Sequence, residues 1–385
     1  MSSQIQPNGT PAPTKDAAEW AARANQAARS VTRSFGRRFL FLPGTHIGAV
    51  SLPSSSLKSL SGPWHYWWQA HYVDCLVDAG RRELAGKTKF DGGSRPSAGR
   101  LASRLVTTIR LRNLLRFVND YYDDMAWLAL ATLRLEKLAE ETRKPGRRRN
   151  AYVQKSLTLQ FDSASTDDFG GGTFWSTKRD FKNTPATAPV ALYYARTGHT
   201  ERAQQLVNWL NSKLLHPERG IYQDGVRIKE GGLAVDTAIY TYNQGPVLGA
   251  LLELGGEDNL RRADLLVDAV KRELTLPGME VIRGEGTGDG GLFTGILLRY
   301  LALAARDGRL PAPTRDTAKS LVHSTAEAFW AGRRVNTGNP SRGTPAIVFS
   351  FDPQRPAAET YPAGAAVELS TQLQAWMALE AAATL

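Results

Sequence analysis

Apolar residues recur at the three- and four-residue spacing of an amphipathic helix along most of the chain. This pattern predicts about twelve helices, over residues 14–33, 61–79, 99–117, 119–140, 150–162, 182–197, 199–214, 235–254, 257–275, 289–307, 313–333 and 361–384. The two-residue alternation that is typical of half-buried strands is rare. The sequence therefore predicts an all-α protein.

Glycine-rich connectors separate the predicted helices, for example at 91–93, 170–172 and 284–288. No Pro- or Ser-rich linker divides the chain midway, so we predict a disordered tail over 1–14 and a single domain over 15–385. Twelve helices in one domain suggest six hairpins in a ring, with long connections that build a site on one rim. A plain bundle or a solenoid is the alternative, although no repeat of about 34 or 40 residues is evident.

The composition indicates a globular protein and argues against metal chemistry. Of the 385 residues, 42% are hydrophobic, which is enough for one large core or two smaller ones. The single cysteine, Cys75, excludes an intrachain disulfide and a cysteine-based zinc site. The six histidines are scattered, with no pair at metal-ligand spacing. We therefore predict neither a metal nor another cofactor.

We interpret the net charge of +11 as diffuse, with its densest cluster at 143–149 in a predicted inter-helix loop. No nucleic-acid-binding module is recognisable, so nucleic acid is not a predicted partner. Attraction to an anionic glycan or glycolipid surface stays open, because charge alone cannot decide it. Residues 1–15 hold no apolar segment, and no apolar run approaches the roughly 18 residues of a membrane span, so we predict a cytoplasmic location.

Two adjacent carboxylates, Asp123 and Asp124, stand just before an apolar helical stretch. Like charges a few ångströms apart raise one pKa and lower the other, which provides an acid and a nucleophile in one site. The alternative is that both cap the helix and complement its dipole, at roughly 0.3–1 kcal/mol each. The aromatic neighbours Tyr121, Tyr122 and Trp127 favour chemistry, because sugar rings stack on such surfaces and glycosidases use paired carboxylates.

Residues 64–74 place an unusual density of aromatic and hydrogen-bonding groups on one predicted helix. Trp68, Gln69 and His71 are the candidates for contact with a ligand in this segment. Core packing alone would rarely choose so many side chains that combine an apolar body with a polar tip. Ordinary core aromatics with satisfied polar tips are the alternative.

Residues 170–183 combine three consecutive glycines with Trp175, Lys182 and Asn183. Glycines let a backbone approach a ligand closely, and Trp175 offers a stacking face. Lys182 and Asn183 offer donors for sugar hydroxyls at the start of a helix. A plain loop in which Asn183 is the N-cap is the alternative.

Residues 240–246 set two amides and two phenols, among them Tyr242, Asn243 and Gln244, in an otherwise apolar helix. Buried amides need partners, and sugar hydroxyls are suitable ones. Asp224 adds a carboxylate in a turn, where turn formation alone is the alternative. Residues 286–291 match G-x-G-x-x-G but lack a β-α-β context, so a dinucleotide site is not predicted.

Taken together, these segments resemble glycoside hydrolase family 76, the bacterial and fungal endo-α-1,6-mannanases. The matching pieces occur in the family's order and cover about residues 60–305; they are 67–71, 121–124 with Trp127, 170–172 with Trp175, 182–183, 224–225, 241–245, 293–296 and 299–300. The resemblance implies an (α/α)6 barrel without a metal that hydrolyses α-1,6-mannan or mannooligosaccharides with retention. It implies that Asp123 is the nucleophile and Asp124 the general acid/base, and neighbouring residues can reach the about 5–5.5 Å separation of retaining enzymes.

We accordingly predict that the substrate contacts the aromatic and hydrogen-bonding side chains of these segments, namely Trp68, Gln69, His71, Tyr122, Trp175, Lys182, Asn183, Asp224, Tyr242, Asn243 and Gln244. Two features depart from the family. Its members that act on extracellular mannan are usually exported, whereas residues 1–15 of this chain hold no apolar segment. Relatives also often have an Asn at the position where this chain has Thr187. The alternatives are another (α/α)6 glycosidase, a sugar epimerase, against which the scattered histidines argue, or a non-catalytic glycan-binding protein, against which the intact Asp pair argues.

Overall fold

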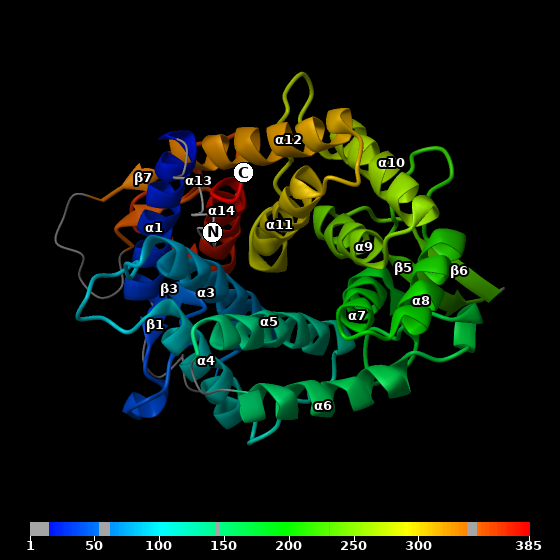
Figure 1. Ribbon diagram of the computed structural model, residues 1–385, viewed down its shortest axis with the longest axis horizontal. Helices are drawn as coiled ribbons and strands as arrows, with labels where there is room; N and C mark the ends of the chain where they lie inside the picture. Colours follow the sequence, from blue (N-terminus) through cyan, green and yellow to red (C-terminus); the bar gives the residue numbers. More distant parts are fainter. Residues whose placement is uncertain (1–14, 54–61, 144–146, 231, 337–344) are drawn as a thin grey trace, which may run out of the picture.

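The computed structural model describes residues 15–53, 62–143, 147–230, 232–336 and 345–385, so the predicted tail 1–14 lies outside the described residues. Within them, twelve long helices form two concentric rings (Figure 1). The inner ring consists of α3 (Tyr66–Gly86), α5 (Tyr122–Glu141), α7 (Thr184–Arg196), α9 (Thr241–Leu254), α11 (Phe293–Arg306) and α14 (Leu369–Ala382). The outer ring consists of α1 (Lys15–Phe35), α4 (Ala98–Arg112), α6 (Arg147–Ala164), α8 (Thr200–Lys213), α10 (Glu257–Leu274) and α12 (Ala312–Ala331).

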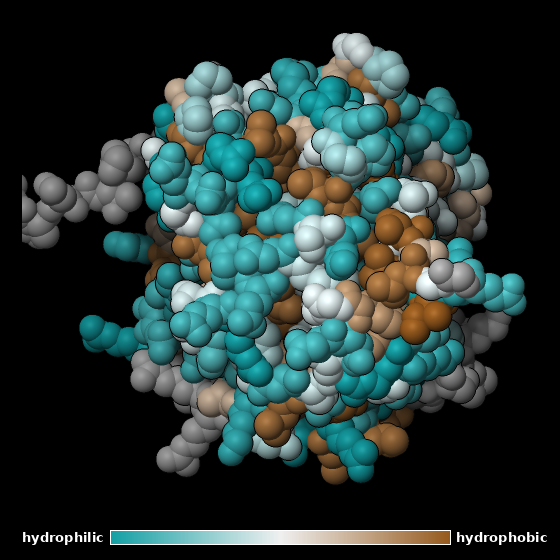
Figure 2. Space-filling model, turned by 90° about the vertical axis from the view of Figure 1, so that its right-hand side faces the viewer, coloured by the Kyte–Doolittle hydropathy of each residue, from teal (hydrophilic) through white to brown (hydrophobic). Residues whose placement is uncertain are grey.

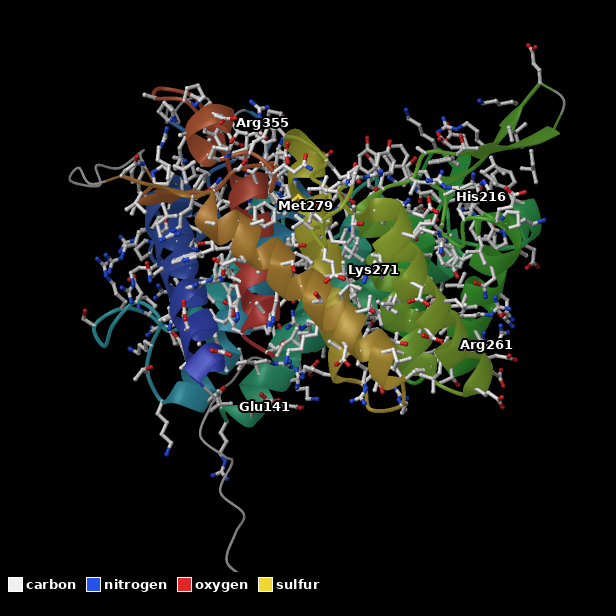
Figure 3. The ribbon with its side chains drawn as sticks, turned by 90° about the horizontal axis from the view of Figure 1, so that it is seen from above. Glu141, His216, Arg261, Lys271, Met279 and Arg355 are labelled. Carbon is white, nitrogen blue, oxygen red and sulfur yellow. The ribbon has the colours of Figure 1, made fainter. Side chains whose placement is uncertain are left out.

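Outer and inner helices alternate along the chain, so each outer helix leads into an inner one. Each inner helix packs against the next, and α14 closes the ring against α3. The connectors that enter the inner helices are long and gather at one end of the barrel, whereas shorter turns join the other end (Figure 3). The structure is therefore an (α/α)6 barrel, and the predicted fold class is confirmed. We call the end with the long connectors the rim.

The predicted helix boundaries differ from the structure mainly at the rim. The helix predicted from residue 235 begins only at Thr241, because the preceding residues form a strand. This strand, β6 (Gly232–Asp236), pairs with β5 (Gly225–Lys229), which pairs in turn with β4 (Phe181–Asn183) in an antiparallel sheet. The backbone groups of two long connectors are satisfied by this pairing, which the helical reading of residues 235–240 missed.

In the described parts of the other connectors, there are three two-stranded ladders and four short helical segments. The ladders are β1 (Gly36–Arg37) with β2 (Ile47–Gly48), β3 (Ser51–Leu52) with β9 (Val367–Glu368), and β7 (Arg334–Val335) with β8 (Ile347–Val348). The short helices are η1 (Phe39–Phe41), η2 (Asp168–Gly170), η3 (Gly288–Leu292) and α13 (Ala357–Thr360). The ladder of β3 with β9 ties the first connector to the last, which closes the rim and delays the start of the last inner helix from the predicted residue 361 to Leu369.

The inner helices are held together by close apolar packing. Every residue of α14 is buried, which is expected of a helix that is enclosed by neighbours on all sides. Between α9 and α11, a Cβ added at Gly245 or Gly249 would lie 2.7 Å from the ring of Tyr300. Both positions therefore require glycine for the two helices to approach so closely.

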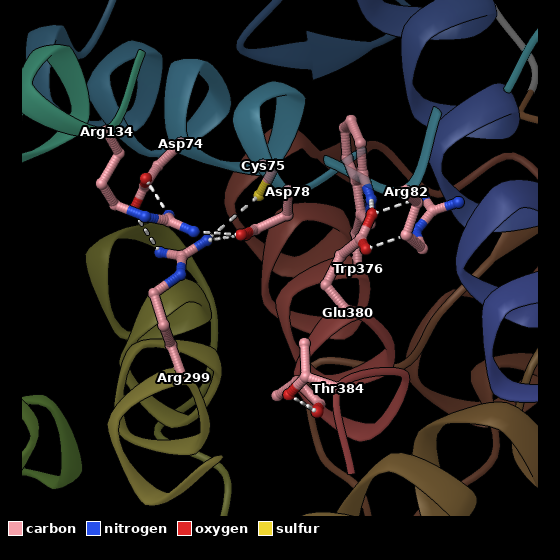
Figure 4. A network of polar contacts seen from close by, with 10 residues as sticks. Asp74, Cys75, Asp78, Arg82, Arg134, Arg299, Trp376, Glu380 and Thr384 are labelled. Atoms are coloured by element: carbon pink, nitrogen blue, oxygen red, sulfur yellow. Dashed lines mark hydrogen bonds and ion pairs between the residues drawn. The ribbon is translucent and has the colours of Figure 1, made fainter. Parts of the chain in front are cut away.

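A buried network of ion pairs joins three inner helices below the rim (Figure 4). Arg299 of α11 contacts Asp74 at 2.8 Å and Asp78 at 2.9 Å, both on α3. Arg134 of α5 contacts the same two carboxylates. Burial by itself raises the pKa of Asp74, but the two guanidinium groups outweigh it and hold that pKa below its usual value. The network consists of two acids and two bases and is neutral overall.

Candidate active site

The Asp pair lies at the rim, in the first turn of α5, and both side chains are half-buried. The Oδ1 atom of Asp123 accepts the backbone N–H of Asp124 at 2.9 Å, and its Oδ2 atom accepts the indole N–H of Trp175 at 3.0 Å. The Oδ2 atom of Asp124 accepts an amide N–H of Asn119 at 2.7 Å. These hydrogen bonds thus fix the orientation of each carboxylate group.

The indole of Trp175 reaches Asp123 because its connector pairs with the segment before α5. The backbone N–H of Tyr122 donates to the carbonyl of Trp175 at 2.8 Å, and the N–H of Trp175 donates to the carbonyl of Phe181 at 2.8 Å. The ring of Tyr121 packs against the indole, with centroids 5.0 Å apart. The side chain of Tyr122 is only 5% exposed, so this residue supports the pair rather than offering a face to a ligand.

The surroundings of the two carboxylates raise the pKa of both. Burial raises the pKa of Asp123 to about 7, against the lowering effect of the hydrogen bonds from Asp124 and Trp175. Burial and the charge of Asp123 raise the pKa of Asp124 well above its usual range. Hydrogen-bond donors stabilise the ionised form of Asp123, and a single proton on the pair is accordingly favoured on Asp124. A carboxylate beside a carboxylic acid can supply a nucleophile and a proton donor to one reaction.

A third carboxylate, Asp289, faces the rim from η3 and was not predicted. The indole N–H groups of Trp67 and Trp68 donate to its Oδ1 atom at 3.0 and 2.8 Å, and its side chain remains 59% exposed. Its negative charge contributes to the raised pKa of both residues of the pair. Asp289 lies inside the glycine-rich segment 286–291, whose G-x-G-x-x-G pattern concerns the glycines and carries no prediction for the carboxylate.

Two half-buried aromatic rings, Trp67 and Tyr242, pack on the buried ring of Phe293 and form a wall beside the pair. Tyr242 stacks on Phe293 with centroids 3.8 Å apart and planes 13° apart, and the ring of Trp67 lies 6.2 Å from Phe293. Trp68, which we predicted to contact the substrate, is only 1% exposed, and His65 stacks on it at 4.1 Å. Of these two neighbouring tryptophans, Trp67 therefore retains the accessible ring, while Trp68 is buried and holds Asp289.

Several polar atoms around the site have no protein partner within the described residues. Both ring nitrogens of His71 are buried and unpaired, and burial lowers its pKa well below the usual value, so the ring is neutral. The amide of Asn243 donates to Asp224 at 3.2 Å, but its Oδ1 atom is unpaired. Burial raises the pKa of Asp224 to about 6. Buried polar atoms without partners are costly, so they indicate positions where a ligand supplies hydrogen bonds.

Comparison with known proteins identifies the family of the chain. The sequence profile of glycosyl hydrolase family 76 matches residues 19–375. The chain belongs to this family. The α-1,6-mannanase GH76A of Salegentibacter sp. HEL1_6 has a similar structure, with 27% identity, a TM-score of 0.77 and coverage of 94% of this chain and 99% of that chain. An inactive variant of that enzyme, with two consecutive aspartates replaced by asparagine, is known in complex with α-1,6-mannotriose and has 27% identity, a TM-score of 0.75 and the same coverage.

The barrel of family 76 extends to more distant proteins. Dfg5 of Chaetomium thermophilum, in complex with glucosamine, shares 17% identity with a TM-score of 0.69, over 96% of this chain and 91% of that chain. At this identity the likeness concerns the fold alone. No curated protein sequence matches the chain. Among the described residues, no group of His, Cys, Asp or Glu side chains is placed to hold a metal ion.

Two amides that we predicted to bind substrate in this family 76 site are instead occupied by the protein backbone. Gln69 accepts the N–H of Gly48 at 2.9 Å and donates to the carbonyl of the same residue at 3.2 Å. Gln244 accepts the N–H of Tyr222 at 2.9 Å and donates to its carbonyl at 2.8 Å. Each amide therefore anchors a connector to an inner helix, and neither has a donor or an acceptor turned to a ligand.

The predicted donors at 182–183 also serve the connector. The ammonium of Lys182 donates to the carbonyls of four residues, Thr166, Asp168, Gly171 and Gly172, at 2.6 to 3.0 Å. Asn183 is the N-cap of α7 and accepts the N–H of Ala186 at 3.1 Å, as in the alternative reading. Thr187 accepts the N–H of Thr173 at 3.0 Å. These three residues thus fix the glycine-rich connector that carries Trp175.

Proposed function

We propose that the protein is a retaining, endo-acting glycoside hydrolase that cleaves α-1,6-mannosidic linkages, with Asp123 as nucleophile and Asp124 as general acid/base. The observation that carries this proposal is the Asp pair, in which Asp123 accepts hydrogen bonds from two donors and stands beside Asp124, whose pKa lies well above its usual range. Membership of glycosyl hydrolase family 76 and the α-1,6-mannotriose complex of the Salegentibacter relative support the substrate class. The loss of two consecutive aspartates in that inactive variant supports the roles of the pair.

The chemistry proceeds in two steps at one carbon. Asp124 donates its proton to the glycosidic oxygen while a carboxylate oxygen of Asp123 attacks the anomeric carbon, so the leaving sugar departs with its hydroxyl restored. Asp124, now ionised, removes a proton from a water molecule, whose oxygen displaces Asp123 from the same carbon. Two inversions give net retention. The wall of Trp67, Tyr242 and Phe293 offers apolar surface to the ring faces of neighbouring sugars.

The direct test is incubation with unbranched α-1,6-mannooligosaccharides, followed by proton NMR of the first product. We expect internal cleavage to shorter oligosaccharides whose new reducing end appears first as the α-anomer. A β-anomer would overturn the retaining mechanism, and release of mannose alone would overturn endo action. An epimerase would change the sugar without shortening the chain, and a binding protein would retain the oligosaccharide intact; either result would overturn hydrolysis.

Alanine variants of the neighbouring residues Asn243 and Gln244 should distinguish a loss of ligand binding from a loss of stability. We expect Asn243→Ala to lower kcat/KM by roughly 10- to 100-fold, because a lost buried hydrogen bond costs about 1–3 kcal/mol and each ~1.4 kcal/mol is tenfold. Gln244→Ala should mainly lower the melting temperature, because it leaves the backbone groups of Tyr222 unpaired. Steady-state kinetics and thermal melts of both variants distinguish these effects. The assignment of Asn243 is wrong if its folded Ala variant hydrolyses at the parent rate.

A further inference from the structure

The positive charge of the chain is concentrated in two segments that contain no acidic residue. Residues 20–73 hold six Lys and Arg residues, residues 92–119 hold six Arg residues, and neither segment contains an Asp or a Glu. These twelve charges exceed the net charge of +11, so the rest of the chain is close to neutral. The interpretation of the charge as diffuse is therefore wrong.

The described residues that follow α1 in the first segment lie against α4 of the second segment. The backbone N–H of His46 donates to the hydroxyl of Thr108 at 3.0 Å, and β2 contacts α4. The guanidinium of Arg112 lies 5.7 Å from the ring centroid of Phe39. Figure 1 shows β1 beside α4 on the side of the barrel opposite the hairpin of β5 and β6. The connector after α1 and the connector after α4 thus form one surface.

Each connector presents bulky apolar side chains to solvent. Phe41 is 84% exposed and is flanked by the exposed Leu40 and Leu42. Leu114 is 85% exposed, next to the exposed Leu115. Leu40, Phe41, Leu114 and Leu115 all have φ between 48° and 63°, a left-handed conformation that bulky residues rarely adopt. These apolar side chains lie outside the protein core, and their exposure to water is unfavourable.

Arginines adjoin the two tips, 40–42 and 114–115, in the chain. Arg38, Arg110 and Arg116 are exposed. Arg104 is close enough to Arg100 and Arg38 that their charges add to burial in lowering its pKa. Two acids border the second segment: Asp91 is occupied by Arg29 and Arg33 of α1, and Asp120 accepts the hydroxyl of Thr177 at 3.4 Å. The arginines that adjoin the tips therefore have no acidic residue in either segment to pair with.

We propose that this surface, consisting of the tips 40–42 and 114–115 and the adjoining arginines, docks on an anionic lipid bilayer. Projecting apolar side chains that are flanked by cations fit the boundary between lipid headgroups and acyl chains. A soluble polyanion would use the arginines but would leave the apolar tips in water. No helix among the described residues is long and apolar enough to cross a membrane, so the contact is peripheral.

Another exposed apolar group provides a comparison within the same chain. The hairpin of β5 and β6 exposes Ile228, Leu233 and Val235, and Figure 2 views the side of the molecule from which this hairpin projects. Its charges are mixed, because Arg227 pairs with Asp236 at 3.4 Å. The hairpin has apolar residues without an excess of cations, which makes it a matched control for the tips.

The surface shares the rim with the Asp pair. The connector 113–121 runs from Leu114 to α5, and within it the amide of Asn113 donates to the carbonyl of Val118 at 2.9 Å, while Asn119 holds Asp124. Docking therefore brings the site close to glycans that are anchored to the same bilayer. This second step rests on the proposed function, whereas the docking itself does not.

The experiment is co-sedimentation of the full chain with phosphatidylcholine vesicles and with vesicles that also contain phosphatidylglycerol. We expect binding to the anionic vesicles that weakens as NaCl is raised. The variant F41N/L114N should lower the partition coefficient by about tenfold or more, since burying one such side chain contributes about 1.5–3 kcal/mol. Asn tolerates positive φ, so this variant should keep its fold. R38Q/R116Q should lower the coefficient by roughly thirtyfold, since each arginine near an anionic surface contributes about 1 kcal/mol.

The control variant I228T/L233T should bind like the parent, and all variants should hydrolyse a soluble oligosaccharide at the parent rate. Absence of binding to anionic vesicles at low salt would overturn the proposal. It would also be overturned if the control lost as much binding as F41N/L114N, or if F41N/L114N bound like the parent while a soluble polyanion displaced the protein. Vesicle binding needs no hydrolysis, so failure of the docking surface and failure of the proposed activity are separate results.

Discussion

Replacement of either aspartate of the pair, Asp123→Asn or Asp124→Asn, is expected to lower kcat on α-1,6-mannooligosaccharides by several orders of magnitude while the fold and glycan binding persist. The amide keeps the shape of the side chain but can neither attack the anomeric carbon nor exchange a proton. Both side chains lie in the first turn of α5, where the substitutions leave the helical packing intact. Steady-state kinetics measure the loss, and calorimetric binding of an oligosaccharide measures what remains.

Azide distinguishes the two roles. With Asp123→Asn, azide can replace the missing nucleophile and attack the anomeric carbon directly, which gives an inverted glycosyl azide. With Asp124→Asn and an activated leaving group, azide can intercept the covalent intermediate and give a retained product. The opposite stereochemistry in the two variants would exchange the assignments. Near-parent turnover by either variant would remove that residue from the mechanism.

The pH dependence of kcat/KM follows from the same pair. Activity requires Asp123 ionised and Asp124 protonated, so the profile should be bell-shaped. Since burial raises the pKa of Asp123 to about 7, the acidic limb should lie well above the usual range of a carboxylate. The charge of Asp123 contributes to the raised pKa of Asp124, so in the residual activity of Asp123→Asn the alkaline limb should move to lower pH. An unchanged alkaline limb would show that the two groups do not interact.

The sequence predicted the ring of helices because the helical period is repeated along the chain and no linker divides the twelve segments midway. It predicted the region of the site because residues with useful chemistry gather in the connectors. It did not predict which side chain of a neighbouring pair faces the substrate. Successive helical residues point about 100° apart, so Trp67 and Trp68, or Asn243 and Gln244, face different surroundings. In an inner helix both directions are buried, and periodicity does not tell the site from the scaffold.

The missed features depend on contacts between distant segments. Asp289 becomes part of the site through hydrogen bonds from Trp67 and Trp68, more than 200 residues earlier in the chain. The ammonium of Lys182 donates to carbonyls of the connector, and these carbonyls come together only in the folded loop. The strands β5 and β6 are too short for a period of two to stand out from their surroundings. In each case the structure depends on neighbours that are distant in the sequence, and local propensity carries no information about them.

The buried network of Asp74, Asp78, Arg134 and Arg299 should be the most sensitive part of the barrel to a single change of charge. We expect Arg299→Met to lower the free energy of unfolding by about 3–5 kcal/mol, because it leaves two buried carboxylates with one guanidinium. The lowered pKa of Asp74 has a consequence for the parent protein. Its contribution to stability is present above the pKa of the unfolded state and is lost as the pH falls through the lower folded-state value.

A second substitution that restores neutrality distinguishes two causes of the stability lost in Arg299→Met, namely the uncompensated charge and the lost packing. In R299M/D78L, one acid and one base are both replaced by apolar groups, which leaves the Arg134 and Asp74 pair balanced. If the uncompensated charge dominates, the double variant should be more stable than Arg299→Met alone in urea unfolding, even though it removes more polar groups. Arg261→Met, which breaks an exposed pair with Asp258, serves as the surface control and should cost about 0–1 kcal/mol. A double variant less stable than the single one would mean that the geometry of the four-membered network, and not its charge balance, holds α3, α5 and α11 together.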